Sequence, residues 1–315
     1  MGKKHLLALI ASLGACGSLP SSCDQTEVSV LTYNVHGLPD SFTEGSPSEN
    51  ITQISPLLNS YDIALIQEDF FYHAELSSAA EHPYQIPKRG SIYNEDGEVV
   101  ANNSGLAYYS EFPLKNHVNR KWFSCNGIVD QENDCLAPKG FSAVYHEITP
   151  NLSVDIYNCH MDSGDSPRDV AARYGQMEQF AKFINTRSQR RAVIVACDTN
   201  MGEWDRSQLE QLLLMTGLKD SCQELSCPEP DRIDRIFYRN GAAVKLEPLR
   251  WYLPTEFGGS SGEGLSDHQP VAVDFKVTVG SFYMQFPQAN MKPHASQVTN
   301  SLAKPMFYVV GRRSP

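Results

Sequence analysis

The chain has 315 residues, of which 41% are hydrophobic and 20% charged, and its formal net charge is −11. These values are ordinary for a soluble globular protein, and the length allows one large domain or two small ones. The acidic balance argues weakly against a duplex-DNA binder, because such proteins gain affinity by neutralising phosphates with basic side chains. A cleft full of carboxylates can still hold an anionic substrate when a bound cation reverses the local charge.

The N-terminus predicts an export signal. Lys3 and Lys4 precede a short apolar stretch, residues 5–15, that is too short to span a bilayer. The four residues that end at Cys16 also resemble a bacterial lipobox, in which Cys16 would be acylated, and ordinary cleavage nearby is the alternative. We therefore expect residues 1–22 to be a signal peptide or lipoprotein leader. The protein would be secreted, or lipid-anchored at the cell surface or outer membrane.

Eight short segments rich in Val, Ile, Tyr and Phe are predicted to be strands. They are residues 27–33, 62–67, 105–109, 141–148, 152–159, 192–197, 233–238 and 270–276. Many short strands with few helices between them argue against a regular parallel βαβ fold, and two packed sheets with helices outside fit better. The last strand closes a domain of residues 24–276 and leaves residues 277–315 as a C-terminal tail of unknown role.

Three helices are predicted from capping residues and hydrophobic periodicity. The first begins at Pro47 after Ser46, and Pro56 should kink or end it. The other two span about residues 167–186 and 206–216, after Ser166 and Asp205 as caps, and Gly217 stops the last. Glu49 gives the first helix a capping box, and Asp169 lies three residues after the Ser166 cap of the second. The apolar stripe of the second helix is predicted to be Val170, Tyr174, Met177, Ala181 and Ile184.

The chain has eight cysteines, and export would permit disulfides. Cys125 and Cys135 flank a loop rich in Asn, Asp and Gly, and Cys222 and Cys227 bracket another short loop. Both pairs are plausible local bridges, although sequence alone does not fix the connectivity. No cysteines stand in a C-x-x-C arrangement, so a structural zinc site is not expected.

Polar side chains stand at the ends of several predicted strands, next to apolar runs. They are Asn34, Glu68, His160, Asp198 with Asn200, and Asp267-His268 before the last strand. One such residue has an ordinary explanation as a cap or turn residue, but the group is harder to explain in that way. Rigid strand ends can present side chains into a shared crevice. The oxygen donors in the group suit Mg²⁺ or Mn²⁺ rather than zinc.

Spacing suggests how these side chains divide the chemistry. Asp198 and Asn200 would face the same side if their strand continued through them, with Asp198 near the metal or attacking water and Asn200 donating to a phosphate oxygen. Asp267-His268 needs a turn for both side chains to face inward. His268 is a candidate general base, because imidazole titrates near neutrality. Asp234 either orients His268 or forms a salt bridge with an arginine, and the local sequence leaves both open.

These residues and their order resemble the endonuclease/exonuclease/phosphatase superfamily over about residues 27–276. The motifs are Thr32-Tyr33-Asn34-Val35, Ile66-Gln67-Glu68, the run 105–110, Cys159-His160-Met161, Cys197-Asp198-Thr199-Asn200, the run 233–237 and Ser266-Asp267-His268-Gln269-Pro270. Each motif alone is weak, but seven in this order and spacing are specific. The resemblance implies an α+β fold, a four-layer α/β/β/α sandwich of two packed mixed sheets flanked by helices, with the active site at one end of the sheets.

The resemblance also implies a metal site. Glu68 would be the main ligand of Mg²⁺ (or Mn²⁺), with Asn34 beside it, and Asp267 would help to hold the metal or His268.

The catalytic roles follow from the same resemblance. Asp198 and Asn200 would orient water and phosphate, and His268, oriented by Asp234, would take the proton from water. His160 would contact the phosphate or assist the leaving group. The reaction would be in-line attack of water on a phosphoester.

Three positions depart from the family pattern. Cys197 stands where family members commonly have Gly, Thr199 where Phe or Met is common, and Cys159 where Thr is common. Both sulfurs would point away from the neighbouring catalytic residues by the period-two rule. If the strands are adjacent, as the resemblance implies, the sulfurs could approach each other, but buried free thiols are the favoured interpretation.

Within the superfamily, bacterial-type neutral sphingomyelinases resemble the chain most. The cues are residues 34–39 after the first strand, residues 68–71 after the metal glutamate, and Lys139-Gly140 before a strand. The predicted activity is that of a metal-dependent phosphodiesterase that hydrolyses sphingomyelin to ceramide and phosphocholine. We expect a monomer that contacts a phospholipid membrane surface. Trp251 and Tyr252 are candidates for that contact, although a buried Trp is commoner.

Three alternatives stay open. A secreted endonuclease would bind nucleic acid, and Asp234-Arg235-Ile236 also resembles pancreatic-type deoxyribonucleases. Its basic groove could use Arg120, Lys121, Arg168 and Arg173. A phosphatase acting on inositol phosphates is the second alternative. A catalytically inactive surface lipoprotein that binds a partner is the third, and the acidic and histidine residues at the strand ends argue against it.

Overall fold

The computed structural model describes residues 25–40, 43, 45–87, 104–127, 134–135, 137–259 and 264–280. The predicted leader, including Cys16, lies outside these residues, as does almost all of the predicted tail. The last strand runs to Val279, slightly beyond the predicted end of the domain at residue 276.

Two six-stranded sheets form the centre of the fold. The first has the order β11 (Val244–Tyr252), β12 (Val271–Val279), β1 (Gln25–Asn34), β2 (Ile63–Gln67), β4 (Ala107–Ser110) and β3 (Tyr84–Ile86). The second has the order β5 (Leu114–Lys121), β6 (Gly140–Thr149), β7 (Leu152–His160), β8 (Val193–Asp198), β10 (Asp234–Arg239) and β9 (Lys219–Asp220). Parallel pairs β1–β2 and β7–β8 lie inside otherwise antiparallel sheets, so both sheets are mixed.

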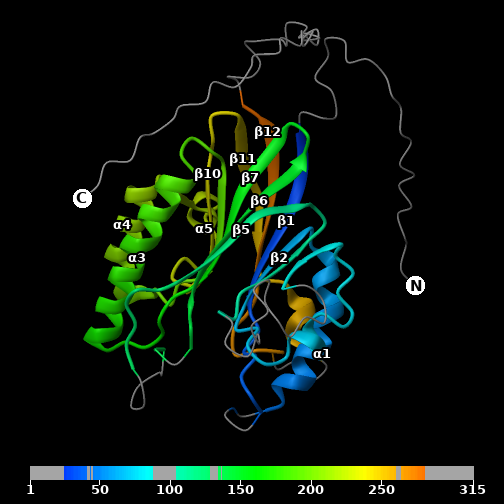
Figure 1. Cartoon of the computed structure of the whole chain (residues 1–315), viewed down its shortest axis with the longest axis vertical. Coiled ribbons are helices and arrows are strands. Elements are labelled where there is room, and N and C mark those ends of the chain that lie inside the picture. Colours follow the sequence, from blue (N-terminus) through cyan, green and yellow to red (C-terminus); the bar gives the residue numbers. More distant parts are fainter. Residues whose placement is uncertain are drawn as a thin grey trace, which may run out of the picture.

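Helices cover the outer faces of the sheets (Figure 1). The helices are α1 (Pro47–Leu57), α2 (His73–Leu76), α3 (Pro167–Arg187), α4 (Arg206–Thr216) and α5 (Ser221–Glu224), with 3₁₀ turns at Leu58–Ser60, Glu203–Asp205 and Thr255–Gly258. In Figure 1, α3 and α4 lie on one side of the sheets and α1 on the other. The predicted four-layer α/β/β/α sandwich is confirmed. No helix in the described part of the chain is long and apolar enough to cross a membrane.

Strand periodicity creates the three layers of core. In β7, Val154 and Ile156 face the apolar core between the sheets, whereas Tyr157 and Cys159 face the core under α3 and α4. A third cluster packs α1 against the first sheet, around Ile51 and Ile54. Successive side chains of a strand point to opposite faces, so each central strand contributes to two cores and is buried on both sides.

All eight predicted strands are present, and the four that were not predicted are the four sheet edges: β3, β11, β5 and β9. Edge strands lack a neighbour on one side, and they commonly carry charges or proline that discourage pairing with other chains. β5 reads LKNHVNRK and is largely solvent-facing, and β11 contains Pro248 next to a register shift. The sequence of β5 therefore lacks the apolar pattern that reveals a buried strand, and Pro248 interrupts the alternation with which β11 begins.

The helix ends agree in part with prediction. Ser166 and Asp169 form the predicted capping box, and Gly217 ends α4 in the left-handed region with φ 67°. Ser46 makes no side-chain cap, and α1 ends one residue after Pro56, as expected of proline. Asp205 does not cap α4 because its carboxylate binds the guanidinium of Arg173 at 2.8 Å.

The predicted apolar stripe of α3 was wrong at two positions. Tyr174 is exposed and Val170 is only partly buried, whereas Met177, Ala181 and Ile184 are buried as expected. Phe180 takes the place of the missing apolar side chain, and Arg173 is buried on the same side. The hydrogen bonds of Arg173 explain how a charged residue can occupy the covered face: it donates to backbone oxygens of residues 162–164 as well as to Asp205.

Three disulfides lie in the described part of the chain. Cys125–Cys135 and Cys222–Cys227 were both anticipated as local bridges. Cys159–Cys197 is also bonded, so the preference for free thiols was wrong. Parallel pairing of β7 and β8 sets these two residues directly opposite each other, with their Cα atoms 4.6 Å apart in the core under α3.

We expect loss of Cys159–Cys197 to destabilise the protein more than loss of Cys222–Cys227. The sequence separations are 38 and 5 residues, and loop-closure entropy then predicts losses of about 4 and about 2 kcal/mol. Denaturant unfolding of the two double-alanine variants measures both. An equal or smaller loss for Cys159→Ala/Cys197→Ala would contradict this ranking.

Candidate active site

The ends of five strands bring the polar side chains together at one end of the sandwich. In the first sheet, Asn34 of β1 pairs with Gln67 of β2, which places Glu68 immediately beyond the ladder. In the second sheet, Asp198 of β8 lies between His160 of β7 and Asp234 of β10. The pairing of the strands thus confirms the predicted convergence within each sheet.

Asn34 links the two halves of the cluster. Its Nδ2 donates to Glu68 Oε1 and to Asp198 Oδ2, both at 3.0 Å, so one amide bridges carboxylates from opposite sheets. Its Oδ1 accepts a hydrogen bond from the backbone N–H of His36 at 3.0 Å. In this arrangement the Asn34 amide group donates to two carboxylates. To bind a metal as predicted, Asn34 would have to use Oδ1, which here accepts the hydrogen bond from the His36 backbone.

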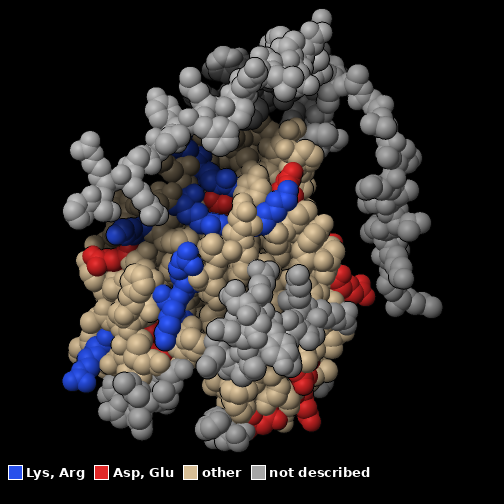
Figure 2. Space-filling model, viewed as in Figure 1, with Lys and Arg blue, Asp and Glu red and all other residues tan. Residues whose placement is uncertain are grey.

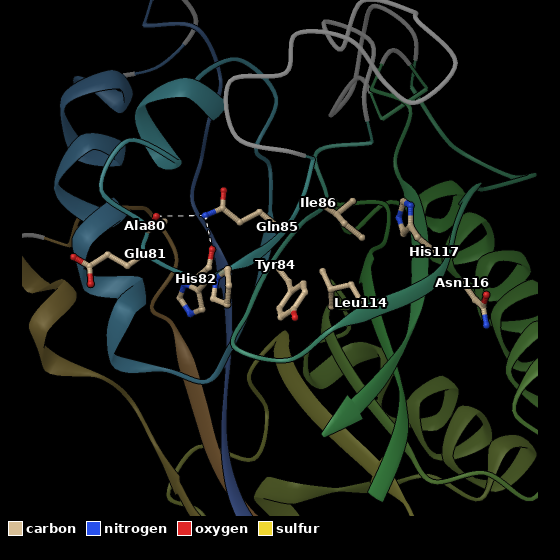
Figure 3. Close-up of a pocket in the computed structure, with 10 residues that line it drawn as sticks. Ala80, Glu81, His82, Tyr84, Gln85, Ile86, Leu114, Asn116 and His117 are labelled. Carbon is tan, nitrogen blue, oxygen red and sulfur yellow. Dashed lines mark hydrogen bonds between the residues drawn. The ribbon is translucent and has the colours of Figure 1, made fainter. Parts of the chain in front are cut away.

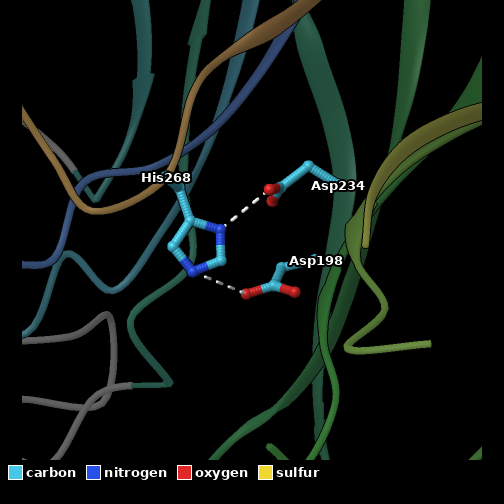
Figure 4. Close-up of side chains that lie close together, drawn as sticks. All are labelled: Asp198, Asp234 and His268. Atoms are coloured by element: carbon cyan, nitrogen blue, oxygen red, sulfur yellow. Dashed lines mark hydrogen bonds and ion pairs between the residues drawn. The ribbon is translucent and has the colours of Figure 1, made fainter. Parts of the chain in front are cut away.

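His268 and Asp234 form a hydrogen-bonded dyad (Figure 4). His268 Nδ1 lies 2.8 Å from Asp234 Oδ2, and its Nε2 faces Asp198 Oδ2 at 3.9 Å. Burial opposes the charged imidazole, but the hydrogen bond and charge of Asp234, with the charges of Asp198 and Asp267, raise the pKa of His268 to about 10. Of the two roles left open for Asp234, contact with His268 is the one present.

His160 lies against the same carboxylates but has the opposite electrostatic character. Its Nε2 is 3.3 Å from Asp198 Oδ2 and 3.8 Å from Glu68 Oε1. Complete burial, with the nearby positive charges of Lys139 and His268, holds the pKa of His160 well below its usual value. A neutral imidazole here can donate its Nε2 proton to an oxygen while carrying no charge of its own.

Glu68 occupies a tightly specified position after β2. Its φ is 59°, a left-handed conformation, and a Cβ on Gly37 would lie 2.2 Å from the Glu68 carbonyl oxygen. That close approach lets the Gly37 N–H donate to the same oxygen at 3.0 Å. Burial raises the pKa of Glu68, and Lys139 and the Asn34 hydrogen bond oppose the shift.

The cluster fits a hard divalent cation. Glu68, Asp198 and Asp234 place three largely buried carboxylates beside one another, and burial together with the charge of Asp198 raises the pKa of Asp234 to about 6. Ligand atoms of Asp198, Asp234 and His268 all lie within 4.8 Å of one another. Oxygen-rich sites with several buried carboxylates suit Mg²⁺ or Mn²⁺, whose charge offsets the mutual repulsion.

Asp267 and Asn200 both lie outside the strands. Asp267 is 58% exposed and its Oδ1 faces His36 Nδ1 at 3.3 Å, while its charge raises the pKa of His268. The strand ends at Asp198, so the premise for a shared face with Asn200 was wrong. Asn200 has φ 49°, its N–H donates to Asp198 Oδ1, and its Nδ2 donates to Met161 O.

The structure adds two neighbours that had no predicted role in the site. Lys139 is buried, forms an ion pair with Asp134, and its charge lowers the pKa of both Glu68 and His160. Ser266 donates to the Asn34 carbonyl and accepts from the His268 N–H, which fixes the turn before β12. A lysine before an apolar strand was the visible signal for Lys139, but nothing local placed it near Glu68.

A cavity elsewhere on the molecule is distinct from this cluster (Figure 3). Its volume is about 850 Å³, and it lies beside the edge strands β3 and β5, lined by residues 80–86 with Leu114, Asn116 and His117. None of the predicted site residues lines it. The chemistry-bearing side chains, rather than the size of a cavity, therefore define the candidate active site.

Comparison with known proteins agrees with the geometry. Residues 31–268 match the endonuclease/exonuclease/phosphatase family. The chain belongs to this family. A protein of Mycobacterium tuberculosis named sphingomyelinase is 32% identical over 278 residues, covering 82% of this chain and 54% of its own length. The chain thus spans about half the length of that family member.

Two solved structures share the fold at low sequence identity. Sphingomyelinase C from Streptomyces griseocarneus superposes with a TM-score of 0.57 at 19% identity, over 79% of this chain and 99% of that one. A variant of beta toxin from Staphylococcus aureus with bound magnesium ions gives a TM-score of 0.57 at 18% identity, with the same coverage. These similarities establish the family sandwich, whereas the roles of individual side chains rest on the geometry above.

We expect Asp234→Asn to lower the pKa of His268 from about 10 toward its ordinary value, because the substitution removes the carboxylate that binds Nδ1. An NMR titration of the imidazole nitrogens in metal-free protein measures the change. Asp267→Asn is the matched control, since Asp267 is exposed and its charge has the smallest effect. An unchanged His268 pKa in Asp234→Asn would contradict the dyad.

Proposed function

We propose that the protein is a divalent-cation-dependent phosphodiesterase that hydrolyses a phospholipid headgroup bond, converting sphingomyelin to ceramide and phosphocholine. The single observation that carries the reaction class is the dyad: His268 Nε2 points toward Asp198 beside a buried carboxylate cluster. The mycobacterial family member named sphingomyelinase supports the choice of substrate.

In the proposed reaction, His268 takes a proton from water at Nε2 while Asp234 holds the ring through Nδ1. Asp198 and Asn200 position that water and the phosphate, and Asn200 would do so from its turn after β8. His160 donates from Nε2 to a phosphoryl oxygen or to the departing ceramide oxygen. General-base assistance of this kind contributes about 10²–10⁴-fold.

A cation at this site would neutralise charge that develops on the phosphate. Glu68 would be its principal ligand, with Asn34 beside it and Asp267 nearer the mouth of the site, and Mg²⁺ or Mn²⁺ fits the oxygen donors. The same charge would lower the pKa of His268, because a nearby cation disfavours imidazolium. His268 would therefore be neutral, and able to accept a proton near neutral pH, only when a cation offsets the charge of the neighbouring carboxylates.

Contact with a membrane is the second part of the proposal, in a protein that acts outside the cell, either secreted or lipid-anchored. Phe71, Phe123 and Trp204 are 56%, 90% and 85% exposed. They follow β2, β5 and β8, whose last residues all lie at the catalytic end of the sheets. Large aromatic side chains with an exposed face suit the boundary between headgroups and acyl chains.

The aromatics first considered for this contact are less exposed. Trp251 and Tyr252 of β11 are partly buried, and both pack against the core clusters. The guanidinium of Arg250 also stacks on the Tyr252 ring, at 3.9 Å from its centroid. Both side chains therefore offer less apolar surface for membrane contact than Phe71, Phe123 and Trp204.

The nuclease alternative loses one of its basic residues. Arg173 is fully buried and bonded to Asp205, so it cannot contact a phosphate backbone. Figure 2 shows Lys and Arg side chains on one half of the visible face, over the second sheet and its helices, and Arg120 and Lys121 are exposed on β5. DNA cleavage therefore stays an outcome to be tested.

We expect purified protein to release phosphocholine from sphingomyelin vesicles with Mg²⁺ and to lose this activity with EDTA. His268→Ala and Glu68→Gln should each lower kcat by about 10²-fold or more, because they remove the base and the main cation ligand. Parallel assays use phosphatidylcholine, plasmid DNA and inositol phosphates. DNA nicking or inositol-phosphate hydrolysis without lipid turnover would overturn the proposed substrate.

We expect Phe123→Ser/Trp204→Ser to weaken sedimentation with sphingomyelin vesicles while hydrolysis of soluble bis(4-nitrophenyl) phosphate is retained. The matched control is Leu214→Ser on α4, which removes an apolar side chain that is also 85% exposed but lies in the last turn of the helix. Equal vesicle binding by the double variant and the wild type would exclude these aromatics as the contact.

A further inference from the structure

A buried polar cluster joins the two sheets directly beneath the candidate active site. Asn158 of β7 is its centre: its Oδ1 accepts from Gln67 Nε2 of β2 at 2.7 Å, and both side chains are fully buried. Asn158 Nδ2 donates to the carbonyl oxygens of Ile66 at 2.8 Å and Ala107 at 3.1 Å. One side chain of the second sheet thus binds two strands of the first.

Further bonds complete this cross-sheet cluster. The backbone N–H of Asn158 donates to the Tyr108 hydroxyl at 3.1 Å, and Ser142 Oγ of β6 donates to the same hydroxyl at 3.0 Å. Gln67 Nε2 also donates to Thr32 Oγ1 at 3.1 Å. Every polar atom of the Asn158 side chain therefore has a partner, although the surrounding inter-sheet core is apolar.

Members of the cluster lie one or two residues before the candidate catalytic side chains in the chain. Asn158 is two residues before His160 and faces the same side of β7, and Thr32 has the same relation to Asn34 on β1. Gln67 immediately precedes Glu68. The residues that hold the sheets together are thus adjacent in the chain to the residues whose separation the reaction requires.

Apolar contacts alone do not fix how one sheet is placed over another, because they have little directional preference. Hydrogen bonds do, since they weaken steeply with distance and angle, and a fully satisfied buried network specifies one arrangement. The active site is divided between the sheets, with Glu68 on the first and His160, Asp198 and Asp234 on the second. Its geometry therefore depends on directional contacts that cross the interface.

We propose that Asn158 is a positioning residue that sets the first-sheet half of the active site against the second-sheet half. The inference rests on the proposed function, because both halves must serve one phosphodiester. Asn158 contacts neither substrate nor reacting atoms. It acts through Gln67 and the Ile66 carbonyl on the position of Glu68, and through β7 on the position of His160.

The first test is Asn158→Ala, with Val154→Ala and Leu152→Ala as matched controls on the same face of β7 and farther from the site. All three substitutions remove buried side-chain contacts, so we expect each variant to have a lower Tm than the wild type. Asn158→Ala should lower kcat about tenfold or more with little change in KM, since small displacements of catalytic groups cost about 10²-fold. Controls of similar Tm should keep near wild-type kcat. If all three variants lose activity in proportion to Tm, Asn158 has only a structural role.

A double variant separates position from stability. Asn158→Leu/Gln67→Leu replaces both side-chain partners with apolar groups of similar size, which can be nearly neutral for folding. We expect it to recover much of the Tm lost in Asn158→Leu while kcat stays low. Recovery of both Tm and kcat would overturn the proposal.

The assays must distinguish failure of the proposed function from failure of the positioning role of Asn158. All variants are therefore assayed on both sphingomyelin and bis(4-nitrophenyl) phosphate, and Mn²⁺ binding is followed by EPR. Wild-type protein that hydrolyses neither substrate contradicts the proposed function. Wild-type turnover of either substrate, with unimpaired turnover and Mn²⁺ affinity in Asn158→Ala, contradicts the positioning role alone.

Discussion

Two parallel strand pairs, one in each sheet, end at the same edge of the sandwich, and their register decides where the candidate catalytic side chains lie. β1 and β2 deliver Asn34 and Glu68, and β7 and β8 set His160 against Asp198. Strand ends inside a two-sheet sandwich are rigid because both neighbours and both faces hold them. The same rigidity allows carboxylates to be buried side by side at a position where an unconstrained chain would separate them.

Burial gives the site its electrostatic character. Carboxylates removed from water attract protons or cations, and the structure holds both kinds of response. His268 takes up positive charge beside Asp234, whereas His160, enclosed near Lys139, resists it. Two imidazoles close to one aspartate thus differ in protonation because of their surroundings. This difference suits one to accept a proton from water and the other to donate a hydrogen bond without charge.

The central strands and the longest helix were predictable because each has a strong local signal. Buried strands are runs of apolar residues, and α3 begins with a capping box that tertiary contacts do not alter. Edge strands such as β5 were not predictable, since half of their environment is solvent and their sequences resemble loops. The same limit applies to Arg173. Its polar partners lie in segments that only the fold brings near, so the local sequence predicts an exposed arginine where the structure has a buried one.

The sequence by itself determined the family sandwich, and it identified the candidate catalytic side chains and their order along the chain. Only the tertiary structure decided which atoms meet. It paired Cys159 with Cys197, joined Asp234 to His268 by a hydrogen bond, ended β8 before Asn200, and left the side chain of Asp267 exposed. The physical reason is that residue type and spacing report local conformation, whereas these contacts depend on inter-strand register and on how one sheet is fixed above the other.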